Sequence, residues 1–317
     1  ACHLVGSAPQ IRPKSPPLVV LVVVDQFRGD ELVKHKALFT DGLKRLLEEG
    51  RWYRNAFHGH SRTETAAGHA TLATGLYPQH HGVVDKRIYD KSQAKRLSVC
   101  GFGPGACDPV VLRAATLGDR LRAASPASKV VSLAQKPRSA MLLGGHSPNL
   151  VAWMEPWSES GKGGLVGRFG ATSSLPHWLH DFYKARVSPD LIPKTWALPL
   201  LPDSYQDVQD LSPWEADPGH GTTFPHKLSI QNLLPRDLFW AWLTTPYGDQ
   251  ALVELAMHTR KAMSLGEDDV PDLLLVSLGA FDAMGHMFGP DSLERVAALV
   301  ALDQQLGNLL RDLDKHA

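Results

Sequence analysis

Thr65 is the residue of this chain whose position most directly indicates chemistry. It precedes the run AAGHATLAT (66–74), whose small residues and spacing are typical of a helix. We therefore expect the Thr65 hydroxyl at a helix N-terminus, where unpaired backbone N–H groups and the helix dipole favour negative charge. The alternative is that Thr65 is an ordinary helix N-cap.

Carboxylate and imidazole groups occupy two further places where a fold can gather functional side chains. Asp25 ends the apolar run PLVVLVVV (17–24), which predicts a buried parallel strand with the acid at its carboxyl end. Asp282 and His286 stand four residues apart in FDAMGH (281–286), so in a helical turn both side chains face one metal ion. The alternative for this pair is a surface contact.

Lys136 and Arg138 follow a second predicted strand, KVVSLAQ (129–135). In an extended chain, side chains two residues apart point the same way. Such a pair of cations suits one phosphoryl group, which arginine binds bidentately. Taken alone, the pair is typical of a solvated edge. Beside metal-type ligands and a hydroxyl that a metal can activate, it predicts phosphate recognition.

The elements that position these residues indicate an α/β fold. A third apolar strand is predicted at DLLLVSL (272–278), and segments with helical spacing separate the strands along the chain. Strands alternating with helices predict a mostly parallel sheet covered on both faces. From about 153 to 242, prolines, tryptophans and short polar segments replace periodic runs. We interpret this stretch as a cap inserted over the sheet.

Composition argues against two classes of partner. The 317 residues include 33 Lys and Arg and 33 Asp and Glu, so the formal net charge is zero and no basic stripe indicates a nucleic-acid partner. No apolar run approaches the roughly 20 residues that cross a bilayer, so no membrane span is expected.

The start of the chain and its cysteines bear on the compartment. Residues 1–16 are Pro-rich, polar and aperiodic, which is typical of a flexible leader left after removal of a signal peptide. Cys2 beside Ala1 also fits the lipid-modified start of a lipoprotein. Cys100 and Cys107, in CGFGPGAC, either close a small disulfide loop in an exported protein or are two unpaired thiols.

Five segments together resemble one known family. They are VVVDQFRGD, TETAAGHATLATGLYPQHHGVV, KPRSAMLLGGH, FPHKL and PDLLLVSLGAFDAMGHMFGPDS. In this order they resemble the alkaline phosphatase superfamily, and within it the bacterial alkaline phosphatases of the PafA type, whose nucleophile is threonine. The nucleotide pyrophosphatases and phosphodiesterases are their near cousins. The resemblance covers residues 17–317 and implies a three-layer α/β/α sandwich that forms one catalytic domain.

The resemblance implies two zinc ions and a threonine nucleophile. Asp25 and Thr65 correspond to ligands of one Zn²⁺, and Asp282 and His286 correspond to ligands of the second. Attack by Thr65 on phosphorus gives a covalent phosphothreonine, which water then hydrolyses. Additional Ca²⁺ or Mg²⁺ sites are compatible with the family.

The resemblance also implies the substrate class and the compartment. Lys136 and Arg138 correspond to the phosphate-binding pair that separates the monoesterases from their diesterase cousins. The expected protein is an alkaline phosphatase of broad specificity for phosphate monoesters, periplasmic or secreted. Two alternatives are a phosphodiesterase or nucleotide pyrophosphatase, and a phosphate-binding remnant without catalysis.

Two departures from the family pattern affect these expectations. Lys86 stands where the family has a phosphate-contacting asparagine, and it either donates to a phosphate oxygen or points to solvent. The Asp-His-Gly segment that supplies further zinc ligands does not occur in the sequence. We therefore expect this chain to be the N-terminal part of a longer polypeptide, whose C-terminal part contributes the remaining ligands as a separate chain or a further segment.

Overall fold

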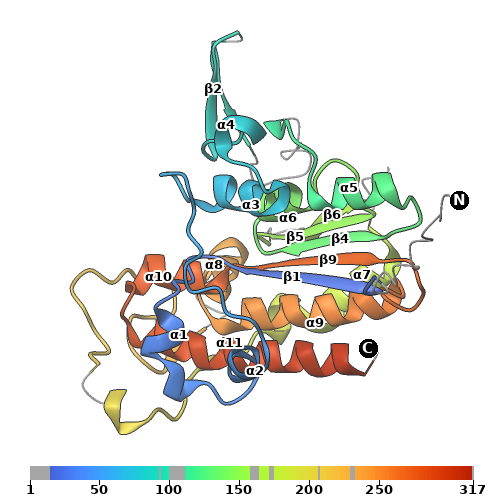
Figure 1. The fold of residues 1–317 in the computed structure, drawn as a ribbon. Helices are drawn as coiled ribbons and strands as arrows, with labels where there is room; N and C mark the ends of the chain where they lie inside the picture. The colour runs from blue at the N-terminus through green and yellow to red at the C-terminus, as the bar shows by residue number, and fades with distance from the viewer. Residues whose placement is uncertain are drawn as a thin grey trace, which may run out of the picture.

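A five-stranded sheet forms the centre of the chain in the computed structural model (Figure 1). The structure describes residues 15–92, 94–99, 111–157, 164–170, 175–205, 208–228 and 233–315. Cys100 and Cys107, and nearly all of the predicted leader, lie outside these ranges. The sheet has the order β1-β9-β4-β5-β6, with β1 at Leu18–Val24, β9 at Asp272–Leu278, β4 at Val130–Ala134, β5 at Leu150–Glu155 and β6 at Gly164–Phe169.

Parallel pairing brings three functional chain segments to one edge of this sheet. Strand β9 pairs in parallel with β1 on one side and with β4 on the other. The register places Val24 opposite Leu278 and Ala134 opposite Ser277, so the strands β1, β4 and β9 end at nearly the same level. The segments that follow these strands therefore begin side by side. The prediction of a mostly parallel sheet is confirmed; among the strands of this sheet that the structure describes, β6 alone runs antiparallel, paired with β5.

Helices cover both faces of the sheet, which makes three layers. Figure 1 shows α3, α5 and α6 on one face and α7, α9 and α11 on the other, with α2 beside α11. No helix in the described ranges is long and apolar enough to cross a membrane. The main helices are α2 (Gly42–Glu49), α3 (Thr65–Thr74), α5 (Leu117–Ala124), α6 (Pro137–Gly144), α7 (His177–Arg186), α8 (Pro235–Leu243), α9 (Pro246–Ala262), α10 (Ala280–Phe288) and α11 (Leu293–Asp314).

Shorter elements complete the described chain. Strands β2 and β3 form an antiparallel hairpin that projects from the sandwich near α4 (Figure 1), and strands β7 and β8 form a second, shorter pair. These elements are α1 (Glu31–Lys34), η1 (Lys36–Leu38), α4 (Pro78–His81), β2 (Arg87–Asp90), β3 (Lys95–Ser98), η3 (Pro189–Leu191), β7 (Thr195–Trp196), η4 (Asp203–Tyr205) and β8 (His226–Lys227).

Strand β9 shows why the central strands are apolar along their whole length. Leu273 and Leu275 pack in a cluster that includes Ala73 of α3, whereas Leu274 and Val276 pack on the opposite face in the main core. Successive side chains of a strand point to opposite faces. Because both faces are covered by helices, every position of β9 is buried, and alternation of apolar with polar residues disappears.

The predicted cap boundary at residue 153 needs correction. Residues 153–155 belong to β5 in the buried centre of the sheet, and β6 then extends the sheet at its edge. Aromatic residues such as Trp153 pack in the core here, so their presence did not mark an insertion. The later part of the stretch does lie outside the sheet: Ala216 N donates to Met287 O at 2.9 Å, and His226 Nε2 lies 3.0 Å from Glu294 Oε1 in the buried start of α11.

Asp303 ties the start of α2 to α11 through one buried carboxylate. The side chain of this α11 residue is 1% exposed. Its two oxygens accept from the backbone N–H groups of Thr40, Asp41, Leu43 and Lys44, at 2.7, 2.8, 2.7 and 3.4 Å. Since the first N–H groups of a helix have no partner inside the helix, Asp303 supplies the acceptors that α2 lacks.

Replacing Asp303 with alanine should lower the free energy of unfolding by about 2–4 kcal/mol, because buried backbone N–H groups lose their acceptor. Urea unfolding of the purified protein measures this change. The matched control is Asp314→Ala, which removes an exposed partner of Arg45 and should change the unfolding midpoint little. Equal shifts for the two variants would contradict the role given to Asp303.

Candidate active site

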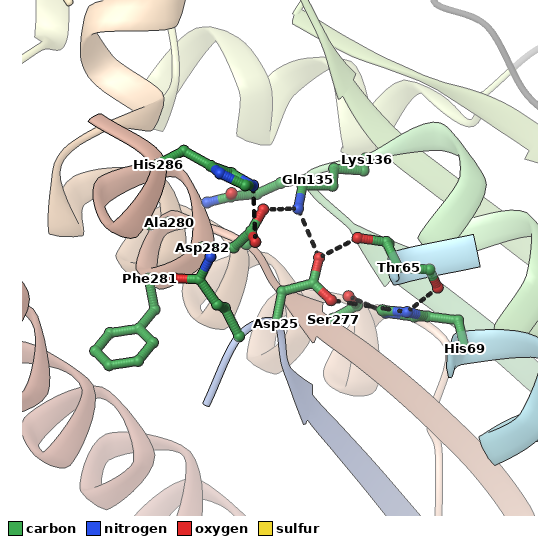
Figure 2. Close-up of polar contacts among 12 residues, drawn as sticks. Asp25, Thr65, His69, Gln135, Lys136, Ser277, Ala280, Phe281, Asp282 and His286 are labelled. Atoms are coloured by element: carbon green, nitrogen blue, oxygen red, sulfur yellow. Dashed lines mark hydrogen bonds and ion pairs between the residues drawn. The ribbon is translucent and has the colours of Figure 1, made fainter. Parts of the chain in front are cut away.

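Three side chains from three strand ends meet at the carboxyl edge of the sheet. Asp25 follows β1, Lys136 follows β4 and Asp282 lies in α10, which follows β9. Lys136 Nζ donates to Asp25 Oδ2 at 2.6 Å and to Asp282 Oδ2 at 2.5 Å (Figure 2). One ammonium group thus lies between two carboxylates that come from positions 257 residues apart in the chain.

Thr65 approaches the same carboxylate from the helical layer. It is the first residue of α3, and Glu64 holds the N-cap position. The hydroxyl of Thr65 donates to Asp25 Oδ2 at 3.2 Å and caps no backbone N–H group in the structure. The alternative of an ordinary N-cap is therefore wrong, and the hydroxyl lies at a helix N-terminus as predicted.

The environment of Asp25 keeps its carboxylate ionised. Burial raises its pKa, but the His69 imidazole, the Lys136 ammonium and the hydrogen bond from Thr65 lower it, and the net pKa lies below its ordinary value. An ionised Asp25 accepts hydrogen bonds only. It therefore orients the Thr65 hydroxyl proton toward itself and leaves an oxygen lone pair of Thr65 free to point elsewhere.

His69 fixes the backbone that carries Thr65. Its Nδ1 atom lies 2.7 Å from the Thr65 carbonyl oxygen, and its Nε2 atom lies 2.8 Å from Ser277 Oγ in β9. Burial lowers the pKa of His69. Because a carbonyl only accepts, Nδ1 is the donor in the first contact, while the Ser277 hydroxyl can pair with Nε2 as donor or as acceptor. The first turn of α3 is thereby joined to strand β9.

Helix α10 bears out the predicted spacing of Asp282 and His286. The two residues lie on one helix four positions apart, and His286 Nε2 is 3.4 Å from Asp282 Oδ1. Asp282 is largely covered, whereas the His286 side chain is 67% exposed and lies at the outer margin of the site. The same aspartate thus contacts His286 with one oxygen and Lys136 with the other.

The two remaining predicted residues, Arg138 and Lys86, differ in burial and in the element that carries them. Arg138 is not in extended chain, and that expectation is wrong: Pro137 begins α6, as proline often does at a first helical position, and Arg138 follows in the first turn. Arg138 is half-buried. The Lys86 side chain is exposed, while its backbone N–H donates to the Glu64 side chain beside Thr65.

The turn after Asp25 is held by a buried arginine. Gln26 has a positive φ of 61°, and its side-chain oxygen accepts from Arg295 Nη1 at 2.8 Å. The same nitrogen donates to the Phe281 carbonyl at 3.0 Å, and Nη2 donates to Glu31 at 3.0 Å. Arg295 therefore connects the neighbours in sequence of Asp25 and Asp282. A Cβ atom on Gly285 would lie 1.9 Å from the Gln26 side-chain oxygen, so any larger residue there would displace the Gln26 amide from its present place.

The family is established by comparison with known proteins. A family model described as type I phosphodiesterase / nucleotide pyrophosphatase matches residues 19–317. The chain belongs to this family. Alkaline phosphatase PafA of Elizabethkingia meningoseptica is 30% identical over 317 residues, covering 95% of this chain and 57% of that protein. The crystal structure of wild-type PafA matches with a TM-score of 0.87 and 30% identity, over 97% of this chain and 61% of that chain.

These comparisons confirm the predicted superfamily and the α/β fold. They also show that the chain spans only part of its relatives' length: alkaline phosphatase PhoD of Zymomonas mobilis is 29% identical over 94% of this chain but 51% of that protein. A shorter match, 33% identity over 26% of this chain, is to ectonucleotide pyrophosphatase/phosphodiesterase family member 3 of Bos taurus. The family thus includes both named phosphatases and named diesterases.

The donor atoms present suit zinc in type but not in number. Asp25 with Thr65, and Asp282 with His286, offer the oxygen and nitrogen ligands that zinc accepts. Within the part of the chain that the structure describes, no group of three or more His, Cys, Asp or Glu side chains gathers into a metal centre. A tetrahedral site takes about four ligands. The two pairs therefore fit two partial sites that need further donors.

Several residues of the site were not identified from the sequence. Ser277 interrupts an otherwise apolar strand, and that polar position was an available signal. Gln135 is the last residue of the predicted strand 129–135, and the sequence around Arg295 offers no pattern that distinguishes this arginine. Their contacts are made to segments distant in sequence, so local pattern carried no sign of them.

The link between His69 and Ser277 should be measurable as a coupling energy. His69→Ala and Ser277→Ala each remove one partner of a buried hydrogen bond, so each should destabilise the protein by about 1–3 kcal/mol. The double variant should cost less than the sum, with a coupling of roughly 1 kcal/mol in a double-mutant cycle of urea unfolding. Strict additivity would show that the contact contributes nothing to stability.

Proposed function

We propose that this chain carries the nucleophile and the phosphate-binding groups of an alkaline phosphatase that hydrolyses phosphate monoesters. One observation carries the proposal: the hydroxyl of Thr65, at a helix N-terminus, shares an oxygen of Asp25 with the ammonium of Lys136. The proposed nucleophile and a phosphate-type cation thus both contact one carboxylate. Relatives named as alkaline phosphatases over most of the chain support the proposal.

In the proposed reaction, Thr65 Oγ attacks phosphorus, its hydroxyl proton passes to solvent, and the bond to the ester oxygen breaks. The leaving alcohol departs with its electron pair and takes a proton from solvent, and the phosphoryl group remains on Thr65. Water then attacks phosphorus, the bond to Thr65 Oγ breaks, and a proton returns to Thr65 as inorganic phosphate is released. Asp25 orients the free hydroxyl before attack, and the His69 contact to the Thr65 carbonyl holds the first turn of α3 in place.

Positive charge stabilises the phosphoryl oxygens in this scheme. Lys136 is the N-cap residue of α6 and Arg138 lies in its first turn, and the N-terminus of α3 adds backbone N–H groups at Thr65. A monoester carries one more negative charge than a diester, so two cations favour the monoester. Lys86 is proposed as a further substrate contact for two reasons. Its backbone N–H group donates to the side chain of Glu64, which precedes Thr65, and its own side chain is exposed.

Two zinc ions are proposed as the cofactor. Asp25 and Thr65 would hold one, and Asp282 and His286 would hold the other. When bound, such ions lower the pKa of a coordinated hydroxyl and neutralise charge on the attacking and leaving oxygens. Ca²⁺ or Mg²⁺ would add structural sites only.

We also propose a partner segment, the C-terminal part of the same precursor. Strand β1 has one neighbour in the described sheet, β9, yet it consists of apolar residues that are mostly only half-buried, with Val19 41% exposed. An apolar groove of about 430 Å³ runs past Leu18 and Val20. Exposed apolar edge strands are prone to pair with further chain. A strand added there would bring new side chains to the edge that holds Asp25.

The second candidate function is a phosphodiesterase or nucleotide pyrophosphatase, which the family description and the short match to the bovine protein favour. The Lys136 and Arg138 pair favours the monoesterase.

We place the enzyme in the periplasm or outside the cell, in accordance with the predicted leader. A phosphate-binding remnant is the outcome if no turnover is found in the zinc-loaded protein expressed from its complete gene.

Thr65→Ala should lower kcat/KM for p-nitrophenyl phosphate by at least about 10³-fold, because the attacking atom is lost. Thr65→Ser keeps a hydroxyl and should retain far more activity. Steady-state kinetics with zinc measure both, and acid-quenched protein should carry phosphate on the parent but not on the alanine variant. An alanine variant with parental activity would rule out Thr65 as nucleophile.

Arg138→Ala should lower kcat/KM for an aryl phosphate monoester by about 10²-fold and for a methyl aryl diester by much less, because one cation is lost. Arg138 is a better position for this test than Lys136. Replacing Lys136 would also remove its contacts with Asp25 and Asp282, whereas replacing Arg138 leaves those contacts intact. The control is Lys95→Ala, on the projecting hairpin. Equal losses on both substrates would instead favour the diesterase.

A further inference from the structure

Asp249 is a buried carboxylate behind the proposed site. It lies in the first turn of α9 and is 4% exposed. One of its oxygens, Oδ1, accepts from three N–H groups: Gln135 Nε2 at 2.8 Å, Gly279 N at 2.9 Å and Ala280 N at 3.2 Å. Two of these donors are the start of α10, and the third belongs to the residue before Lys136.

The start of α10 depends on this contact. Its N-cap residue is Gly279, which has no side chain to satisfy the first N–H groups of the helix. Asp249 supplies that acceptor from another helix. Asp282 lies one half-turn further along α10, so the direction in which α10 leaves β9 fixes where its carboxylate points.

The backbone of two glycines, Gly248 and Gly279, lies close to the side-chain amide of Gln135. A Cβ atom on Gly248 would lie 2.7 Å from Gln135 Nε2, and one on Gly279 would lie 2.8 Å from Gln135 Oε1. Gln135 is 2% exposed. Glycine on both sides thus lets the amide reach Asp249, and the backbone that leads into Lys136 has little freedom to move.

We infer that Asp249 is a positioning residue, which sets Lys136 and Asp282 relative to each other by joining the strand β4 exit to the start of α10. The inference rests on the proposed function, because it assigns the two positioned side chains to phosphate and metal binding. It goes beyond that function by placing a determinant of activity on α9, away from every group that would touch the substrate.

The cost of burying Asp249 agrees with a role beyond packing. Burial raises the pKa of Asp249 to about 7, although the N–H groups of Ala280 and Gly279 oppose the rise. An apolar side chain would fill the same space without the free-energy cost of burying a carboxyl group. The three N–H groups that donate to Asp249 explain why an acceptor is needed at this position.

Two substitutions at this position separate positioning from folding. Asp249→Ala removes the acceptor. Asp249→Asn keeps the one oxygen that accepts from all three N–H groups and replaces only the other carboxylate oxygen with NH₂. The matched control is Asp303→Ala, which removes a buried acceptor from the start of α2 in the same way and whose hydrogen bonds described above go to residues 40–44, not to a proposed site residue. Kinetics with p-nitrophenyl phosphate, urea unfolding and hydrogen exchange of the peptide 279–286 are measured for all three.

We expect Asp249→Ala to lower kcat/KM by about 10- to 100-fold, chiefly through kcat, since small misplacement of reacting groups costs this much. Asp249→Asn should stay within about threefold of the parent, and Asp303→Ala should lose stability but stay within about twofold in kcat/KM, because it leaves the site in place. Exchange in 279–286 should accelerate in Asp249→Ala only.

Unchanged exchange in Asp249→Ala, or equal kinetic losses in Asp249→Ala and Asp303→Ala, would overturn the inference. Hydrogen exchange requires no turnover, so it keeps the two proposals apart. An inactive parent with accelerated exchange in Asp249→Ala would remove the proposed function and support the structural link. An active parent with unchanged exchange in Asp249→Ala would support the proposed function and remove the positioning role of Asp249.

Discussion

The parallel pairing of β9 with both β1 and β4 is the constraint on which the rest of the structure depends. Parallel strands release their chains at one edge, and here the three released segments carry Asp25, Lys136 and Asp282. These groups therefore lie close together without long connecting loops between the strand ends and the functional side chains. A shift of one residue in either register would reverse the faces of a whole strand and separate the carboxylates, so the buried core and the site are specified by the same pairing.

Charge at this edge is balanced over very short distances. Two carboxylates near each other would repel, and the Lys136 ammonium between them offsets the repulsion. The buried polar groups around this triplet each have partners: His69 has the Thr65 carbonyl and Ser277, and Asp249 has three N–H donors. Satisfied networks of this kind define one geometry, because any displacement leaves a buried group unpaired.

How far the sequence leads depends on whether a feature is local. The apolar strands, the helix after Thr65 and the four-residue spacing of Asp282 and His286 follow from local pattern, and the structure has them where they were predicted. Arg138 was misplaced because Pro137 was treated as part of an extended chain. The cap boundary failed because tryptophan is common both in cores and in insertions. Asp249 and Arg295 were out of reach, since their significance lies in partners remote in sequence.

Gly285 has a consequence for how this site can vary in evolution. Glycine within a helix costs about 1 kcal/mol relative to alanine, and α10 accepts that cost between its two proposed ligands because the Gln26 side chain occupies the space. A side chain at 285 would first meet the Gln26 amide, and moving that amide would take from Arg295 one of its acceptors. Position 285 is therefore linked to Arg295 on the next helix through Gln26, which contacts both. Substitutions at these three positions should affect one another.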